Sequence, residues 1–509
     1  MKAGQDNRLI RVSPFELNLE NEWNVPVSFF ANEEINLEKK AVDELLKVIS
    51  TQETVLRLQK EAPDFFDKTK DISLEKVVLT PDFHKGSGIP IGTVMATKGF
   101  ILPQAVGNDV NCGMRFEATS FQLEDIIKNL DSIEENLRNI FFGGARNIPM
   151  SKTQRQSLLQ YGLPGLLETS SDAKGLGIWQ GMSISKEENH LSKMHGNGAY
   201  RAKGIFGMEE YLKRSDGVSH DPVIGNVGGG NHFAEVQYVK KILNPQAAFN
   251  WGLKEGQIVM MIHSGSLGLG HGTGRYAMDI LKEIYPKNCR FPENGIFPLP
   301  LHEAFSTELE NYRCSLANSA NFAFANRFML SRMLLKGLAC GKDAEADLIY
   351  DAPHNLMWDK DGRTVHRKGA TPAGGWKEVQ GTAYRFWGEP VIVPGSMGSS
   401  SYLMLGQGNE NSLCSACHGA GRLIGRGAAM QVDDKEIEEF IRNFRIVTSV
   451  NPNDASVKGR RDILGKWKAQ LKQEAPMTYK NITPVVETLK EAQIAQPVAE
   501  LFPVLTVKS

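Results

Sequence analysis

Seven of the eleven histidines lie in short strings rich in Gly, Pro or Asn. Such strings are typical of turns at strand ends, where rigid strands present side chains to a cleft. One such histidine is more often a structural, hydrogen-bonded residue, but seven in the same context favour a shared site that uses imidazole as a metal ligand, a base or a nucleophile. They are His84 in PDFHKGSG, His232 in GGGNHFAE, His263 and His271 in IHSGSLGLGH, His354 in YDAPHNL, His366 in VHRKGAT and His418 in CHGAGR.

A carboxylate and a thiol belong with these imidazoles. The string NDVNCG places Asp109 and Cys112 three residues apart at another predicted turn. Taken alone, Cys112 would be interpreted as a small buried hydrophobic residue. Taken with the histidines, these residues are of the types that bind metal ions. The softness of their thiolate and imidazole donors favours zinc or cobalt rather than manganese.

The string CSACHGAGRLIGR contains Cys414-x-x-Cys417-His418, the spacing of covalent haem attachment. Haem attachment belongs to export compartments, whereas the N-terminus shows no apolar signal region and the six cysteines are expected to be mostly reduced thiols. A zinc ribbon would need a second Cys-x-x-Cys pair, and the chain has no other. The sequence therefore disfavours both roles for His418.

Composition limits the class of protein without choosing a partner. With 41% apolar and 23% charged residues, the 509-residue chain has the balance of a soluble globular protein. No apolar run is long enough to span a bilayer, so a cytoplasmic protein without a membrane partner is expected. Because 58 Lys and Arg oppose 59 Asp and Glu, a nucleic acid would have to be bound by a local cluster of basic residues.

The elements that must position these residues are strands and helices in no regular alternation. Helical periodicity predicts helices over 37–61, 123–142 and 303–341, and a charged helical tail after 435. Residues 143–222 are polar and poorly periodic, and we interpret them as a helical excursion on the surface. β-branched segments around the histidine strings predict short strands. The sequence thus predicts an α+β fold of mixed, mainly antiparallel sheets flanked by helices, in a single large domain over 1–509.

Four Gly-rich turns could direct backbone N–H groups at anionic oxygens: NVGGGN, GSLGLGHGTG, GSMGSSS and HGAGR. The chain has neither a P-loop nor a Rossmann fingerprint, and it lacks the Lys-x-Asp-Gly string of lysine-dependent nucleotidyl transferases. If a nucleotide is activated covalently, another nucleophile must act. Histidine can do so through a phosphoramidate, provided that its other ring nitrogen is held in the right tautomer.

Taken together and in order, the strings resemble those of RtcB-type RNA ligases. The resemblance runs from about residue 80 to the C-terminus and is specific, because about ten short strings recur in one order. It is carried by PDFHKGSGIPIG, GNDVNCGMR, GGGNHFAEVQ, IHSGSLGLGH, NFAFANR, YDAPHN, VHRKGAT, VPGSMGSSSY, CHGAGRLIGR, EAPMTYK and the final VLTVK.

The resemblance implies a GTP-dependent and Mn²⁺-dependent ligase that joins RNA ending in a 2′,3′-cyclic phosphate or 3′-phosphate to RNA with a 5′-hydroxyl, in tRNA splicing or RNA repair. It also raises an archease-like activator as a partner. His418 would be the nucleophile that becomes guanylylated. Two Mn²⁺ ions would be bound by Cys112, His263 and His354 and by Asp109, Cys112 and His232, with a bridging thiolate. Asn231 would contact the GMP phosphate, Glu235, Ser401, Tyr479 and Lys508 would hold guanine, and Arg422 and Arg426 would bind RNA phosphates.

Two departures from the family pattern affect charge. Leu267 stands in GSLGLGH where the family has arginine, and Pro372 stands in HRKGATPA where the family has another. We expect these losses to affect RNA binding more than nucleotidyl transfer, unless Arg313, Arg367 or Lys368 supplies a substitute charge. Two alternatives remain open: a catalytically weak RNA-binding homologue, and a metal-dependent phosphodiesterase that opens cyclic phosphates without ligating.

Overall fold

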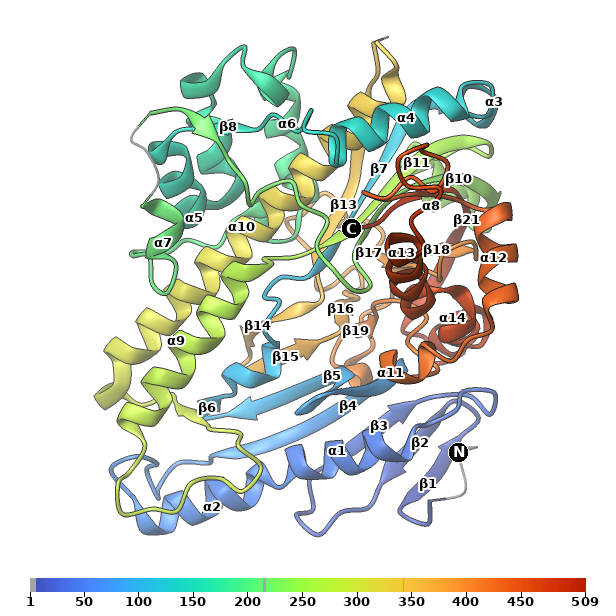
Figure 1. Ribbon diagram of the computed structural model, residues 1–509. Helices are drawn as coiled ribbons and strands as arrows, with labels where there is room; N and C mark the ends of the chain where they lie inside the picture. The colour runs from blue at the N-terminus through green and yellow to red at the C-terminus, as the bar shows by residue number, and fades with distance from the viewer. Residues whose placement is uncertain (1–5, 214–216, 342) are drawn as a thin grey trace.

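The computed structural model describes residues 6–213, 217–341 and 343–509. In these residues two large β-sheets form the centre of the molecule, and helices cover them. Figure 1 shows the N-terminal strands and the first sheet in the lower half of the molecule, the second sheet above it, and the long helix α10 along one side.

The first sheet combines N-terminal strands with two strands from the second half of the chain. Its strands pair antiparallel, except that β3 and β4 are parallel. In spatial order they are β1 (Leu9–Ser13), β2 (Glu16–Leu19), β3 (Val27–Phe30), β4 (Ser73–Ser87), β5 (Ile89–Lys98), β15 (Arg363–Lys368) and β14 (Asn355–Lys360).

The second sheet is also mainly antiparallel, and β20 (Arg445–Val447) adds one parallel pair beside β21. The predicted α+β fold of mainly antiparallel sheets is therefore confirmed. In spatial order the main strands are β13 (Ala346–Pro353), β7 (Gly113–Gln122), β11 (Gln257–Ser264), β10 (Phe233–Ile242), β21 (Ala495–Val507), β18 (Ser401–Gly406) and β17 (Pro390–Val393).

Three short strand pairs complete the strands found in the described residues. The pair of β16 (Ala370–Pro372) and β19 (Ser415–Cys417) matters most, because His418 follows β19 directly. The other two pairs are β6 (Phe100–Ile101) with β12 (Leu299–Pro300), and β8 (Pro149–Met150) with β9 (Ser219–His220).

The predicted helix over 37–61 is two helices, α1 (Lys39–Ile49) and α2 (Thr51–Glu61). They meet at Ser50, whose hydroxyl donates to the Lys47 carbonyl at 2.7 Å. A serine that bonds to nearby backbone competes with the helical ladder, which accounts for the break.

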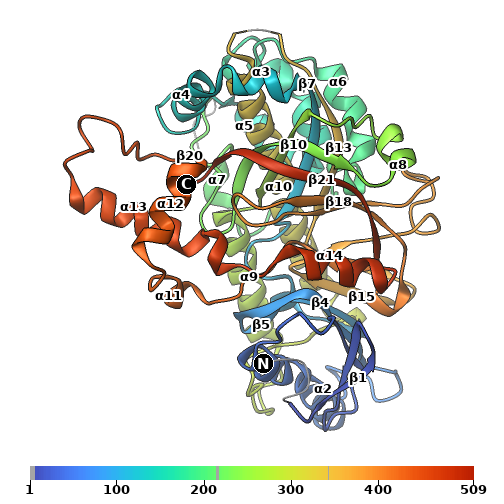
Figure 2. The same ribbon diagram turned by 90° about the vertical axis from the view of Figure 1, so that its right-hand side faces the viewer.

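The predicted long helix over 303–341 is confirmed as α10 (Ser306–Ala339), which is buried over most of its length from Tyr312 to Leu338. Figure 2 shows α11, α12 and α13 standing out from the body at one side. None of the helices in the described residues is long and apolar enough to cross a membrane. The remaining helices are α3 (Leu123–Ile127), α4 (Leu130–Phe141), α5 (Lys152–Glu168), α6 (Ile184–His190), α7 (Glu209–Leu212), α8 (Pro245–Asn250), α9 (Gly268–Ile284), α11 (Arg426–Ala429), α12 (Asp434–Asn443), α13 (Arg461–Glu474) and α14 (Ile482–Glu491).

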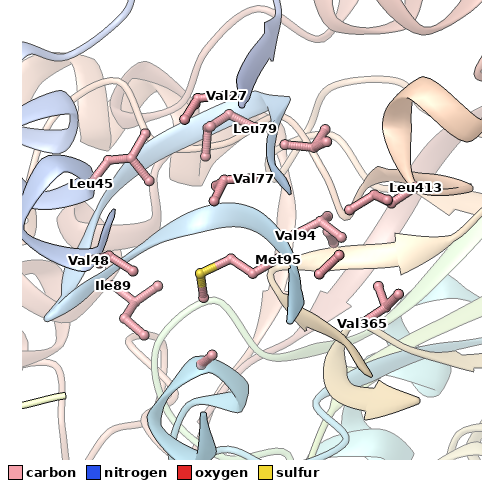
Figure 3. Packing of buried hydrophobic residues seen from close by; sticks show 14 of the residues in the cluster. Val27, Leu45, Val48, Val77, Leu79, Ile89, Val94, Met95, Val365 and Leu413 are labelled. Carbon is pink, nitrogen blue, oxygen red and sulfur yellow. The ribbon is translucent and has the colours of Figure 1, made fainter. Parts of the chain in front are cut away.

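Helix α1 packs its apolar face on β4 and β5 (Figure 3). Leu45 and Val48 lie on the same side as Val77 and Ile89, and all four side chains are buried. Each such side chain contributes about 1.5–3 kcal/mol when it leaves water. The N-terminal residues are thus part of the core that carries the first sheet.

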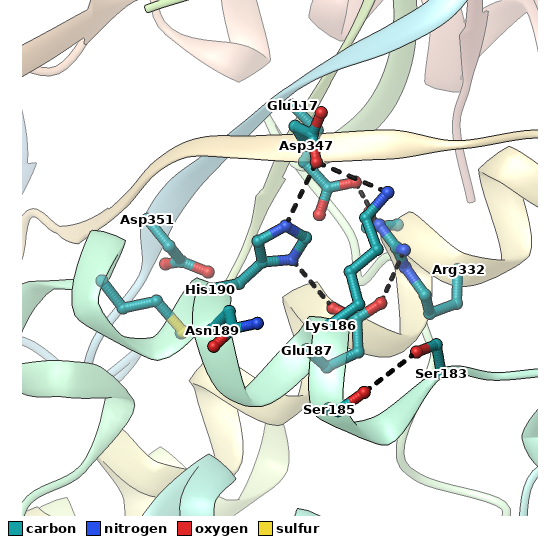
Figure 4. A network of polar contacts seen from close by, with 12 residues as sticks. Glu117, Ser183, Ser185, Lys186, Glu187, Asn189, His190, Arg332, Asp347 and Asp351 are labelled. Carbon is teal, nitrogen blue, oxygen red and sulfur yellow. Dashed lines mark hydrogen bonds and ion pairs between the residues drawn. The ribbon is translucent and has the colours of Figure 1, made fainter.

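Segment 143–222 holds α5, α6 and α7, and buried charges tie it to the core (Figure 4). Arg332 of α10 donates to Glu187 of α6 at 2.9 Å, and Glu187 also contacts His190 at 3.1 Å. The other nitrogen of His190 lies 3.6 Å from Asp347 on β13. Because removing one partner would leave a buried charge unpaired, these contacts fix α6 against the sheet and α10.

Candidate active site

A cavity of about 550 Å³ lies where strand ends of the second sheet meet the β19 segment. Every candidate site residue except Ser401 lines it. The lining candidates are Asp109, Cys112, Asn231, His232, Glu235, His263, His354, His418, Arg422, Arg426, Tyr479 and Lys508.

Five of the seven histidines that share a sequence context line this cavity, including His84. The other two do not. His366 accepts the N–H of Leu102 at 3.0 Å and is structural, and His271 is exposed on α9. The shared context therefore predicts the site for most of the set, but not for each member.

The register of β10 and β11 brings two candidate metal ligands together. Phe233 pairs with His263, so His232, the residue before Phe233, lies beside the end of β11. The two imidazole rings are 5.1 Å apart between centroids.

The register of β7 and β13 brings two more candidate metal ligands together. Gly113 pairs with Pro353, which places Cys112 and His354 side by side just beyond the paired residues. The backbone N–H of His354 donates to the Cys112 carbonyl at 2.8 Å, which locks this register at the site.

The five candidate ligands form two groups, each with its ligand atoms within 4.8 Å of one another. The Cys112 sulfur lies 3.1 Å from His232 Nε2 and 3.3 Å from His263 Nε2, and it belongs to both groups. His263 Nε2 lies 3.2 Å from His354 Nε2, and Asp109 lies 2.9 Å from His232 Nε2.

The protonation states of these ligand residues favour the binding of a cation. Burial holds the pKa of His263 and of His354 well below the ordinary value, so both rings are neutral. His263 Nδ1 donates to the Asn231 carbonyl at 3.1 Å, which leaves the Nε2 lone pair directed at the cluster. Burial, reinforced by the Asp109 charge, raises the pKa of the Cys112 thiol, and a bound cation would reverse that effect. The donor set therefore fits a metal ion.

Arg327 of α10 supports the loops that carry these ligands. Its fully buried guanidinium donates to the carbonyls of Asn111 at 2.6 Å and Ser264 at 3.0 Å, each next to a candidate ligand. Asp351 balances the charge at 2.8 Å. Through Arg327, the NFAFANR segment supports the site from a helix.

Asp82 orients His418. His418 Nδ1 lies 2.6 Å from Asp82 Oδ2, and Thr80 donates to Asp82 Oδ1 at 2.5 Å. Burial alone would raise the pKa of Asp82, but the imidazole charge and these two hydrogen bonds lower it below the ordinary value. When the ring is neutral, an ionised Asp82 keeps the one proton on His418 Nδ1 and leaves Nε2 as the nitrogen with a free lone pair. The His354 ring is 4.7 Å from the His418 ring, so this nitrogen belongs to the same cavity as the metal-ligand cluster.

One cavity wall is the hairpin between β4 and β5, and α1 fixes it. Glu38 accepts the backbone N–H of Lys85 at 3.1 Å, and Glu44 accepts that of Gly86 at 2.8 Å. Lys368 donates to carbonyls of the same hairpin. The wall is therefore held by side chains from both halves of the chain.

The candidate guanine residues in the cavity include two buried charged side chains, Glu235 and Lys508. Burial raises the pKa of Glu235 from 4.5 to about 7 and lowers that of Lys508 to about 8. Lys508 donates to the Gly230 carbonyl at 2.7 Å, beside Asn231. Ser401 is buried at the start of β18, outside the cavity lining, and it accepts from the Gln237 amide, which also donates to Glu235.

The structure also shows the surroundings of Leu267 and Pro372, the two positions at which the resemblance leads us to expect arginine. Leu267 has a positive φ of 53°, and its N–H donates to Asp109 at 3.1 Å. Pro372 is buried in β16 opposite Ser415. Among the described residues, none of the three basic side chains considered as substitutes lines the cavity: Arg313, Arg367 and Lys368.

Two buried carboxylates at the site were missed by the sequence analysis. Asp82 lies in PDFH and Glu474 in EAPMTYK, so both were inside quoted motifs. The available signal was an acidic residue inside a motif that was interpreted only through its histidine or tyrosine.

Comparison with known proteins agrees with this geometry. The family model described as tRNA-splicing ligase RtcB matches residues 68–509. A tRNA-splicing ligase RtcB of Thermococcus kodakarensis is 31% identical, over 85% of this chain and 87% of that protein.

Two further relatives extend the range of organisms. A tRNA-splicing ligase RtcB of Nanoarchaeum equitans is 29% identical and covers 97% of both chains. An RNA-splicing ligase RtcB homolog 1 of Entamoeba histolytica is 31% identical, over 85% of this chain and 80% of its own length. With a family model that matches most of its length and a cavity that gathers the family's motifs, the chain belongs to the RtcB family of RNA ligases.

Proposed function

We propose that this protein is a GTP-dependent RNA ligase that joins 2′,3′-cyclic phosphate or 3′-phosphate ends to 5′-hydroxyl ends. The observation that carries the proposal is the Asp82–His418 pair at 2.6 Å, next to a buried cluster of metal-ligand type. A histidine fixed at Nδ1 is prepared for attack through Nε2.

In the first step GTP is a substrate. The Nε2 lone pair of His418 attacks the α-phosphorus, the bond to pyrophosphate breaks, and a phosphoramidate forms. Asp82 accepts a hydrogen bond from Nδ1–H throughout, so it stabilises the positive charge that develops on the ring.

The two ligand groups would hold two Mn²⁺ ions, with Cys112 shared between them. When bound, such ions neutralise phosphate charge and act as Lewis acids in phosphoryl transfer. We propose manganese because of the family membership, although thiolate softness alone favours zinc. His263 contributes a neutral nitrogen fixed by the Asn231 carbonyl.

In the later steps water opens a 2′,3′-cyclic end to a 3′-phosphate and a 2′-hydroxyl. GMP then passes from His418 to the RNA 3′-phosphate, and the 5′-hydroxyl attacks the activated phosphate with loss of GMP. The ionised Glu235 carboxylate accepts from guanine N1–H and its exocyclic amine, a pattern that adenine does not offer. Asn231, Tyr479 and Lys508 complete the proposed nucleotide site, and Ser401 supports Glu235 through Gln237.

The test is incubation with α-labelled GTP and Mn²⁺. The wild-type chain is expected to become covalently labelled, and His418→Ala is expected to lose the label while it keeps its metal, because His418 is not a proposed ligand. An unlabelled wild-type chain that still opens cyclic phosphates would instead support the phosphodiesterase. Label retained in His418→Ala would place the nucleophile elsewhere.

A further inference from the structure

Glu474, the last residue of α13, lies where several proposed substrate-binding side chains converge. One carboxylate oxygen is 3.2 Å from Arg422 and 3.7 Å from Arg426. The other accepts the Tyr479 hydroxyl and lies 4.0 Å from Lys508. The side chain is only 7% exposed and lines the cavity.

The Arg422 guanidinium is used almost entirely inside the protein. Its Nε donates to the Ile424 carbonyl at 3.3 Å, and Nη2 donates to that of Gln473. Nη1 donates to Glu474 and, at 3.2 Å, to the Tyr479 hydroxyl, and the guanidinium carbon lies 5.1 Å from the Tyr479 ring centroid. Four of its five N–H groups are thus engaged. Arg422 therefore contacts Tyr479 both at its hydroxyl and at the face of its ring.

Arg426 differs from Arg422 in this respect. Its side chain is 56% exposed, and its contact with Glu474 is a single, longer ion pair. Such a pair exchanges readily for a phosphate, because its geometry is loose and water competes for it.

The three basic side chains around Glu474 also need its negative charge. Arg422, Arg426 and Lys508 would repel one another in a partly buried space if this carboxylate were absent. Burial already lowers the pKa of Lys508 to about 8, and Glu474 is the strongest charge that opposes this effect.

We propose that Glu474 is a positioning residue of the nucleotide site: it fixes Tyr479 and Lys508 for guanine, keeps Arg422 as an internal clamp, and leaves Arg426 as the arginine that meets RNA phosphate. This inference rests on the proposed guanylylation, since Tyr479 and Lys508 act on guanine only in that function. Glu474 itself touches no reacting atom.

The experiment compares Glu474→Ala, Glu474→Gln and Tyr479→Phe in the full chain, with GTP as the probe. We expect Glu474→Ala to raise KM for GTP in covalent labelling about 10- to 100-fold, as for loss of a hydrogen bond to a charged group, with the saturated rate changed less than about threefold. Glu474→Gln keeps one acceptor and should fall between. Adding Tyr479→Phe to Glu474→Ala should raise KM little further, because the two residues act as a unit.

A second measurement separates the two arginines. Binding of single-stranded RNA with a 3′-phosphate is followed as salt rises. Arg426→Ala should reduce the slope of log affinity against log salt by about 0.7, as expected for one lost phosphate contact, whereas Arg422→Ala should leave the slope unchanged and raise KM for GTP.

The outcomes are distinguishable. If the wild-type chain is never labelled, the proposed function fails. If it is labelled and Glu474→Ala, Glu474→Gln and Tyr479→Phe all keep the wild-type KM, the positioning role is wrong. Equal salt slopes for the two arginine variants would overturn the division between them. If Glu474→Ala unfolds, Glu474→Gln and Tyr479→Phe decide the matter.

Discussion

The floor and the rim of the cavity are built in different ways. The floor consists of the five candidate metal ligands and His418, which sit at strand ends and are held by buried backbone and side-chain contacts. The rim consists of Arg422, Arg426 and Glu474, which come from the segment after His418 and from α13. Helix α13 belongs to a small apolar cluster of its own around Trp467.

The difference indicates a division between chemistry and substrate choice. Ligand atoms on the floor need positions fixed within fractions of an ångström, and paired strands supply that rigidity. In the proposed function the rim would accept RNA ends of different shape, which a small peripheral cluster with the exposed Arg426 can do. Leu267 and Pro372 leave all candidate ligands in place, in agreement with this division.

The largest effect is expected for Cys112→Ala on the floor. Because the sulfur belongs to both ligand groups, both metal positions should be depleted together and labelling lost, whereas His232→Ala should affect mainly one position. Metal content of the purified variants measures this. Cys417→Ala is the matched control, since that thiol is also buried but lies outside the groups. A full metal complement in Cys112→Ala would contradict a Cys112 sulfur shared by the two metal positions.

Asp82→Asn should come next. An asparagine amide can donate to Nδ1, which moves the ring proton to Nε2 and blocks the nucleophile, so guanylylation should slow about 10²- to 10⁴-fold with metal content retained. Single-turnover labelling measures the rate. Thr80→Val is the control, because it removes only one bond to Asp82. Labelling of Asp82→Asn at the wild-type rate would show that the tautomer is not controlled from this side.

A smaller effect is expected from pH at the nucleotide site. Glu235 has its pKa raised to about 7, so it becomes protonated as pH falls below 7 and no longer accepts both guanine donors. Lys508, with a pKa of about 8, loses its charge above pH 8. KM for GTP should therefore be lowest between about pH 7 and 8 and rise on both sides. Labelling rates against GTP from pH 6 to 9 test this, and Glu235→Gln should lack the acid limb.

The smallest effect is expected for Leu267→Arg. A restored guanidinium adds one charge-assisted contact near the phosphates, so RNA joining should rise several-fold while guanylylation stays within about twofold. Both steps are measured on one preparation. Leu267→Met controls for side-chain length without charge. An equal gain in both steps, or the same gain with methionine, would contradict a role confined to RNA.

Much of the floor could be predicted because its residues carry their own sequence signal. Histidines in Gly-rich strings and the Asp109–Cys112 spacing indicate strand ends and metal ligands even without a family. The pairing itself could not be predicted: Gly113 opposite Pro353 is a contact between distant strands, and no local pattern specifies which strands become neighbours.

The last strand and two acidic residues were harder to predict, because their places also depend on contacts between distant parts of the chain. The C-terminal tail was expected to be helical, and α12, α13 and α14 are, but β21 follows them and pairs in the middle of the second sheet. Asp82 and Glu474 lie inside quoted motifs, but no local pattern indicates that either side chain is buried, because an acidic residue is usually solvated. Only the folded chain shows that one of them meets His418 and the other meets the basic side chains of the rim.

The contacts of Glu38 and Glu44 with the β4–β5 hairpin have a consequence for how the protein can be divided. Both glutamates precede residue 68, where the match to the family model begins. A fragment trimmed to the matched residues would lose three strands of the first sheet and both acceptors that hold this wall. A unit that keeps these strands and both acceptors therefore starts no later than Leu9, and a graft or split of this enzyme has to carry residues 9–67 along.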